Sequence, residues 1–116
     1  MKKIALLTGA ALAAALAFAA PAGAQRAARC AVTSSGSSWT GPCQFMAERG
    51  GSFSISRRDG RSFPGGATSI SVAIEGGEAD VRGLTRQGIN SRWGSASRDR
   101  RDRACWVGSD FRVCAY

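Results

Sequence analysis

The side chains behind most enzyme chemistry are missing from the bulk of this 116-residue chain. It contains no histidine, and both of its lysines, Lys2 and Lys3, lie at the N-terminus. Without histidine, Ser-His-Asp and Cys-His nucleophile systems and histidine zinc sites are excluded. The four cysteines are better explained by disulfides than by zinc thiolates. We therefore expect no catalytic centre, no metal and no cofactor.

Carboxylates are the remaining groups that could act as an acid, a base or a cation ligand. Glu75, Glu78 and Asp80 lie close together, and Asp80 follows Glu78 by two residues, so they could share one face of a hairpin. Such a trio could bind Ca²⁺ weakly or supply an acid/base pair. Their spacing matches no known loop motif, and we interpret them as a polar turn that points into water.

Arginines near a tryptophan form the candidate binding surface. Arg92 and Trp93 lie in a stretch rich in glycine and serine, and Trp93 has few apolar neighbours in sequence. Guanidinium groups suit phosphate or carboxylate oxygens, and an exposed indole can stack on sugars or bases. We predict that both residues bind anionic polymers weakly, together with a following group of arginines: Arg98, Arg100, Arg101 and Arg103.

The abundance of arginine also has two interpretations that involve no ligand. Arginine without lysine, beside abundant alanine and glycine, is the composition that GC-rich codons produce. In addition, Asp99 and Asp102 interrupt the arginine group and could pair within it, whereas phosphate binding favours uninterrupted positive charge.

The first 24 residues have the pattern of a secretory signal peptide. A positive start is followed by an apolar run from Ile4 to Ala20 and by an Ala22-x-Ala24 cleavage site. Processing would leave a single domain, residues 25–116, without a transmembrane segment. Subtracting the two lysines from 16 basic residues leaves 14 arginines against 8 carboxylates, a charge of +6. This charge favours anionic partners.

Four cysteines in a short exported chain indicate two disulfides, for which three pairings are possible. Counting inward from Cys105 and Cys114 leaves Ser109-Asp110 as a two-residue turn and places the cysteines at a non-hydrogen-bonded pair, within bridging distance. Trp106 then faces Val113, and we expect it to lie in the core. The register predicts the bridge Cys105–Cys114.

The same counting applies to the other two cysteines. Between Cys30 and Cys43 it leaves Gly36-Ser37, which is typical of a type II′ turn. Pro42 would then face Ala31 at a hydrogen-bonded pair without an N–H to donate, so this hairpin must be an edge or contain a bulge. We predict the bridge Cys30–Cys43.

Alternating polar and apolar residues predict strands. Residues 69–75 form the clearest one, and Gly76-Gly77 turns the chain back through 78–83, so that Val72 faces Val81. Phe53 and Ile55 point inward from a second strand, residues 52–56. Residues 83–97 are interpreted as a loop with one short strand at most. The predicted fold is all-β, roughly six to eight short antiparallel strands in a meander that forms a small sandwich or open barrel.

Four segments resemble those of uncharacterised small exported disulfide-containing proteins of Gram-negative bacteria: Gly41-Pro-Cys-Gln-Phe45, Gly50-Gly-Ser-Phe53, Gly88-Ile-Asn-Ser-Arg-Trp-Gly94 and Ala104-Cys-Trp-Val-Gly-Ser-Asp-Phe111. The resemblance implies a periplasmic or secreted location. It implies no activity, and no functional residue can be carried over.

These observations together favour a monomeric, non-enzymatic binding protein of the cell envelope. Its expected partners are anionic envelope polymers or another protein, and nucleic acid is not expected in vivo. The alternative is a secreted or periplasmic inhibitor of another enzyme. Such an inhibitor would present residues 83–97 as a rigid exposed loop.

Overall fold

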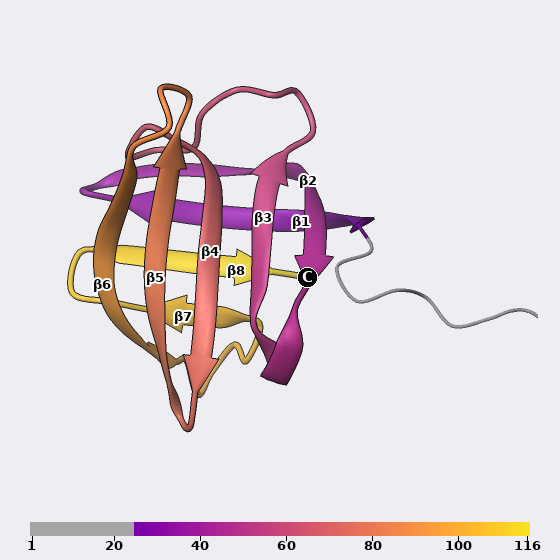
Figure 1. Cartoon of the computed structure of the whole chain (residues 1–116). Coiled ribbons are helices and arrows are strands. Elements are labelled where there is room, and N and C mark those ends of the chain that lie inside the picture. Colours follow the sequence, from indigo (N-terminus) through magenta and orange to yellow (C-terminus); the bar gives the residue numbers. More distant parts are fainter. Residues whose placement is uncertain (1–24) are drawn as a thin grey trace, which may run out of the picture.

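The computed structural model describes residues 25–116, and the predicted signal peptide lies outside them. Eight antiparallel strands form a closed barrel in which each strand pairs with the next and the last returns to the first (Figure 1). The all-β prediction is confirmed, and pairing between the first and last strands closes the barrel. In chain order the elements are β1 (Gln25–Ser34), β2 (Ser37–Ala47), the 3₁₀ turn η2 (Arg49–Gly51), β3 (Phe53–Arg57), β4 (Ala67–Glu75), β5 (Glu78–Thr85), β6 (Asn90–Arg98), β7 (Cys105–Val107) and β8 (Phe111–Ala115).

The barrel is built from two layers whose strands cross. Figure 1 shows β3, β4, β5 and β6 side by side in one layer, with β1, β7 and β8 running across them in the other. β2 belongs to both layers, because it pairs with β1 along its length and with β3 through residues 43–47. The β1–β2 and β7–β8 turns lie at one end of the second layer, and the start of β1 lies at the other (Figure 1).

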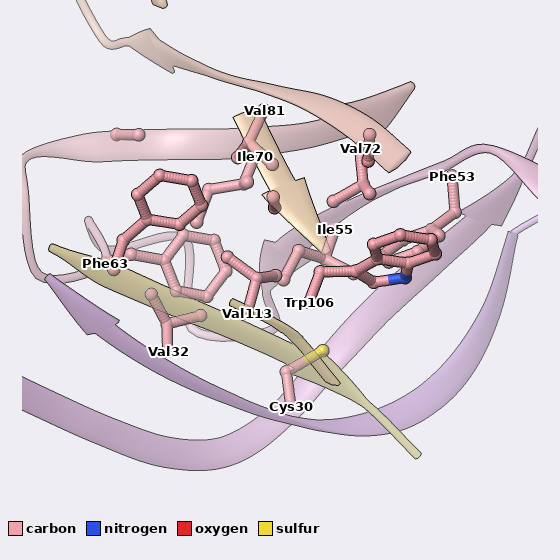
Figure 2. Close-up of a cluster of buried hydrophobic side chains, with 14 of the residues drawn as sticks. Cys30, Val32, Phe53, Ile55, Phe63, Ile70, Val72, Val81, Trp106 and Val113 are labelled. Atoms are coloured by element: carbon pink, nitrogen blue, oxygen red, sulfur yellow. The ribbon is translucent and has the colours of Figure 1, made fainter. Parts of the chain in front are cut away.

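Side chains from all eight strands fill the barrel interior, and the loop residue Phe63 joins them. Figure 2 shows Ile55, Ile70 and Val113 converging at the centre of this core. Phe53 and Ile55 point inward, as predicted. Burial of this apolar surface is the main force that holds a sheet of this size closed.

The two hairpins with the strongest sequence signals have the predicted registers. In the β4–β5 hairpin Val72 faces Val81, and both side chains are fully buried. In the β7–β8 hairpin Cys105 faces Cys114 with Cα atoms 4.0 Å apart, and the predicted disulfide joins them. Trp106 is buried, as predicted.

The β1–β2 hairpin contains the predicted disulfide, but the predicted register is wrong. Its turn is Ser35-Gly36, so Cys30 faces Gly41 instead of Cys43. The bridge therefore joins two cysteines diagonally across the strands, with Cα atoms 5.8 Å apart. Both bridges are typical of an oxidising compartment outside the cytoplasm.

Two local features favour the observed register of this hairpin. Ser35 and Gly36 have φ values of 49° and 86°, and a type I′ turn, which matches the twist of paired strands, requires positive φ at both positions. The shift also moves Pro42 from Ala31 to Arg29. Counting from the turn, this is a non-hydrogen-bonded pair, so β1 does not need the N–H that proline lacks.

The interpretation of residues 83–97 as a loop is wrong. β5 continues to Thr85 and β6 begins at Asn90, which leaves residues 86–89 as a tight tip. The N–H of Gly88 donates to the Thr85 carbonyl, and the N–H of Ile89 donates to Thr85 Oγ1. The many glycines and serines of this segment give no alternating apolar pattern, and the strand is recognised only from its pairing with β5. Within residues 25–116, no helix has the length and apolar character needed to cross a membrane.

Candidate binding site

β6 separates the two halves of the surface that the sequence predicted. Arg92 and Trp93 line a hollow beside the Ser35 turn, whereas Arg98 lies at the other end of the strand. Five residues of extended strand span about 16 Å. Arg98 and Arg103 line a second hollow together, so the structure unites these two arginines but not all six predicted residues.

Trp93 is half-buried, although its sequence neighbours predicted an exposed anchor. It occupies a bulge in β6, because Val81 faces Gly94 and Arg82 faces Arg92, which leaves Trp93 without a partner in β5. The indole packs edge-on against the Phe111 ring with centroids 5.7 Å apart. Its role in the fold is therefore structural.

Glycine backbone provides the rest of the Trp93 environment. A Cβ atom built on Gly83 would lie 2.7 Å from Trp93 Nε1, and one built on Gly65 would lie 2.9 Å from the indole ring. Only a residue without a side chain leaves room for the indole at both positions. A search for apolar neighbours in the sequence does not find these two glycines, because they have no side chains.

Arg92 is engaged in an ion pair on the outside of the barrel. Its Nε lies 2.6 Å from Asp80 Oδ1, and a second nitrogen donates to Ser95. Asp80 also contacts Arg82 at 3.3 Å. Arg92 is therefore less available to a ligand than the sequence suggests, although an exposed pair of this kind adds little stability.

The second hollow, which we call the basic hollow, has a volume of about 180 Å³. Its arginines come from three separate elements: Arg26 in β1, Arg98 in β6 and Arg103 in the loop before β7. No carboxylate is among the described residues that line it, which are Arg26, Phe45, Gly51, Phe53, Arg98, Arg103, Ala104, Trp106 and Ala115.

Two of these arginines each cover an aromatic ring that faces them across a pair of strands. Arg26 faces Phe45, and its Cζ lies 4.2 Å from the ring centroid. Arg98 faces Trp106 in the same way, with a distance of 4.7 Å. Contacts of this type fix the plane of a guanidinium while leaving the N–H groups at its edge free to donate.

The floor of the basic hollow is aromatic and belongs to the core. Phe45 stacks on Phe53 with ring centroids 5.0 Å apart, and Phe53 and Trp106 are almost fully buried. Figure 2 shows the Trp106 indole and the Phe53 ring together at one side of the core. Because core packing holds these rings in place, the arginines that lie on Phe45 and Trp106 are also held in place.

Asp99 and Asp102 were candidates for pairing within the arginine group, but both contact residues at the end of the chain. Asp99 accepts a bond of 2.8 Å from Arg112, and this bond lowers the pKa of the Asp99 carboxyl below its ordinary value. Asp102 accepts a 2.6 Å bond from the Tyr116 hydroxyl, which raises the pKa of that phenol. The neighbouring arginines are consequently not neutralised.

The remaining predicted arginines stay unpaired as well. Arg100 and Arg101 are exposed but do not line the basic hollow. Among residues 25–116, side chains in ion pairs are confined to four arginines, Arg57, Arg82, Arg92 and Arg112, and their three aspartates. Positive charge is thus in excess in and around the basic hollow.

Arg57 shows how an arginine with a structural role differs from those of the hollow. It also lies over an aromatic ring, 4.6 Å from that of Trp39, but it is bound on both edges. Two of its nitrogens donate to Asp59, which lowers the pKa of that carboxyl, and a third donates to the Ser62 carbonyl. For Arg26, Arg98 and Arg103, the described residues provide no such acceptor side chain.

Sequence reasoning missed Arg26, Phe45 and Phe53 as members of the site. The β1–β2 register was the signal that could have indicated the pair Arg26 and Phe45, but the turn was placed one residue too late. The contribution of Phe53 depends on barrel closure, which no local pattern encodes.

The carboxylate trio at the β4–β5 turn gives no cation site. Glu75 and Glu78 face each other, but Asp80 is engaged by two arginines. Across residues 25–116, no cluster of histidine, cysteine and carboxylate side chains is arranged to hold a metal ion.

No family model matches the chain, and no curated protein or solved structure matches it either. What the basic hollow can do therefore follows from its own chemistry. Guanidinium groups are donors without an acceptor and do not exchange protons near neutral pH. The hollow is suited to holding an anion against an aromatic floor.

Proposed function

We propose that this protein is a periplasmic or secreted, non-enzymatic binding protein that holds anionic groups of envelope polymers in its basic hollow. One observation carries the proposal. Arg26, Arg98 and Arg103 come from three different elements to one hollow that has no carboxylate in its lining. Like charges repel, and a bound anion would relieve the repulsion among these three arginines.

The size of the hollow indicates how much of a ligand it holds. Pockets that enclose a whole small molecule measure roughly 300–1,000 Å³. At about 180 Å³, the basic hollow suits one charged group and part of the unit that carries it. The rest of the ligand would extend over the outer surface, where Arg100 and Arg101 lie nearby in sequence.

The cysteines and the predicted signal peptide support the proposed location. The two disulfides favour an oxidising environment, and the cell envelope or the exterior provides one. Both compartments contain polymers rich in phosphate and carboxylate, and residues 25–116 carry a charge of +6. Charge attraction would also speed the encounter with such polymers.

The test is binding of the mature protein to lipopolysaccharide and to polyphosphate at 50 and 200 mM salt. We expect binding at low salt that weakens roughly tenfold or more at high salt, as three phosphate contacts imply. The test variant is Arg26→Gln/Arg98→Gln/Arg103→Gln. Its matched control, Arg29→Gln/Arg58→Gln/Arg61→Gln, removes the same charge from exposed arginines outside the hollow.

We expect the hollow variant to lose at least tenfold in affinity and the control variant to lose much less. Equal losses would show that net charge alone drives binding, which contradicts a defined site. A protein that binds neither polymer at 50 mM salt would contradict the proposed function altogether.

The alternative is an inhibitor of another enzyme, and one observation favours it. The tip between β5 and β6 is ordered by backbone hydrogen bonds, yet it exposes 60% of Ile89. An inhibitor would use this short tip in place of the longer loop expected from the sequence. Under that function, Ile89→Ser would abolish enzyme inhibition while the hollow variant kept it.

A further inference from the structure

We propose that the basic hollow selects phosphomonoester groups over sulfate, carboxylate and phosphodiester groups. This inference rests on the proposed function and adds the identity of the charged group. It is carried by three arginines, Arg26, Arg98 and Arg103, that line one hollow of single-group size.

The number of donors matches a phosphomonoester better than the other anions. Such a group carries a charge of about −1.5 to −2 at neutral pH and offers three terminal acceptor oxygens. A carboxylate offers two oxygens and one charge. A phosphodiester has two terminal oxygens and one charge, and a sulfate ester has three oxygens but only one charge. Of these anions, only the phosphomonoester offers three guanidinium groups both three terminal oxygens and a charge of about −2.

Two of the three donor side chains, and the backbone that carries the third, are also held in position before the ligand arrives. Cross-strand contacts hold the Arg26 guanidinium over Phe45 and the Arg98 guanidinium over Trp106. Arg103 lies in a loop that is fastened on both sides, because the N–H of Asp99 donates to the Cys105 carbonyl and that of Cys105 donates to the Asp102 carbonyl. Fixed donors bind with a smaller loss of side-chain entropy.

The carboxylates near the basic hollow do not neutralise its arginines. Asp99 and Asp102 are bonded to Arg112 and Tyr116. Glu48 and Arg49 precede the rim residue Gly51, are exposed and have opposite charges. No side chain with a neutralising role therefore enters the hollow from these elements among the residues that the structure describes.

The chain has an unusual property that makes the inference testable by pH. It has no histidine, and both cysteine pairs within residues 25–116 are oxidised. Ordinary carboxyl, phenol and guanidinium side chains change charge outside a window of about pH 5 to 8. The α-amino group that processing would leave on Gln25, next to Arg26, is the exception, because an ordinary α-amino group titrates at about pH 8. It loses positive charge as the pH rises, which weakens anion binding. A rise in affinity between pH 5 and pH 7.5 must therefore come from the ligand.

A phosphomonoester loses its second proton near pH 6. The dianion fraction rises from roughly a tenth at pH 5 to nearly all at pH 7.5, so the affinity should rise roughly tenfold if the dianion is the bound form. A sulfate ester stays singly charged throughout, and its affinity should remain constant.

The experiment measures binding of glucose 6-phosphate, glucose 6-sulfate and glucuronate to the mature protein by NMR titration at pH 5 and pH 7.5, in low salt. Vesicles with phosphatidic acid and vesicles with phosphatidylglycerol extend the comparison to lipids. Preference for the soluble sugar phosphate would identify a sugar-borne group, and preference for phosphatidic acid would identify a lipid-borne one.

Arg103→Gln is the test variant and Arg100→Gln, from the same loop but outside the hollow, is its control. We expect the Arg103 variant to lose most of the preference for phosphate over sulfate and the Arg100 variant to keep it. Equal, pH-independent binding of phosphate and sulfate would overturn this inference and leave the proposed function intact. No binding of glucose 6-phosphate by a protein that still binds the polymers would overturn it too. If the protein binds neither the polymers nor the small anions, the proposed function itself is contradicted.

Discussion

Arg98 and Trp106 face each other across β6 and β7, and the guanidinium carbon lies 4.7 Å from the centroid of the indole. This pair connects the fold to the proposed site. Trp106 is nearly fully buried, so the core fixes the indole, and the indole fixes the guanidinium. The same arrangement recurs between Arg26 and Phe45. Two of the three arginines of the basic hollow are thus positioned by residues whose own place is determined by folding.

Gly83→Ala should destabilise the protein, because its new Cβ would lie 2.7 Å from Trp93 Nε1 and force the indole to move. Overpacking of this kind costs about 1–3 kcal/mol. The measurement is urea unfolding followed by tryptophan fluorescence. Gly77→Ala is the control, since nothing lies within 4 Å of a Cβ there and its φ is not in the left-handed region. Equal stability of the two variants would show that Trp93 does not pack on Gly83.

Val72→Ala should lower the free energy of unfolding by roughly 1–3 kcal/mol, a little below the range for larger core truncations. Val72 is fully buried opposite Val81. The neighbouring variant Ser71→Ala lies on the other face of β4 and should change stability by about 0.5 kcal/mol or less. A loss of only a few tenths for Val72→Ala in urea unfolding would refute the assigned faces of this hairpin.

Removal of either disulfide should destabilise the fold by roughly 2–3 kcal/mol, because each bridge closes a short loop. The variants are Cys30→Ala/Cys43→Ala and Cys105→Ala/Cys114→Ala, compared by thermal unfolding. Peptide mapping without reduction provides the control on connectivity. A peptide that joins Cys30 to Cys105 or Cys114 would contradict both hairpins.

Stability should be constant from about pH 5 to pH 9 and fall on either side. Bonds from Arg57 and Arg112 lower the pKa values of Asp59 and Asp99. The stability that these two carboxylates contribute is therefore present above about pH 4 and is lost as acid protonates them. The pKa of Tyr116 is raised by its bond to Asp102, so that contribution is present below about pH 10 and is lost as the phenol ionises.

Urea midpoints measured from pH 2 to pH 11 check this profile. Asp99→Asn should flatten part of the acid limb and change the alkaline limb only slightly, because the main partner of Tyr116 is Asp102. A step in stability between pH 5 and pH 8 would contradict the profile, because residues 25–116 contain no histidine or free thiol that could produce it.

The sequence was sufficient for the fold class and for those hairpins whose turn and apolar alternation agree. Val72 with Val81 and Cys105 with Cys114 are of this kind, since a slip of one residue would turn each apolar set outward. The first hairpin was misplaced because Ser35 adopts a positive φ that the sequence does not demand. Both cysteine pairings were nonetheless correct, because a disulfide can also form diagonally.

The site was harder to predict, because its parts meet only when the barrel closes. Arg98 and Arg103 could be singled out from their local pattern, and the structure places both in the basic hollow. Arg26 comes from the other end of the chain, and its place depends on the register of β1 with β2. Trp93 was misjudged because its packing partners include Gly83 and Gly65, which have no side chains to signal contact.

The most direct test of the central claim is an NMR map of where an anion binds. Arginine Nε–H and tryptophan Nε1–H signals of the mature protein are recorded during titration with polyphosphate at 50 mM salt. The structure predicts the largest shifts at Arg26, Arg98 and Arg103, with a response from the Trp106 indole beneath Arg98. Shifts spread evenly over all 14 arginines, or centred on Arg92 and Trp93, would contradict a site at the basic hollow.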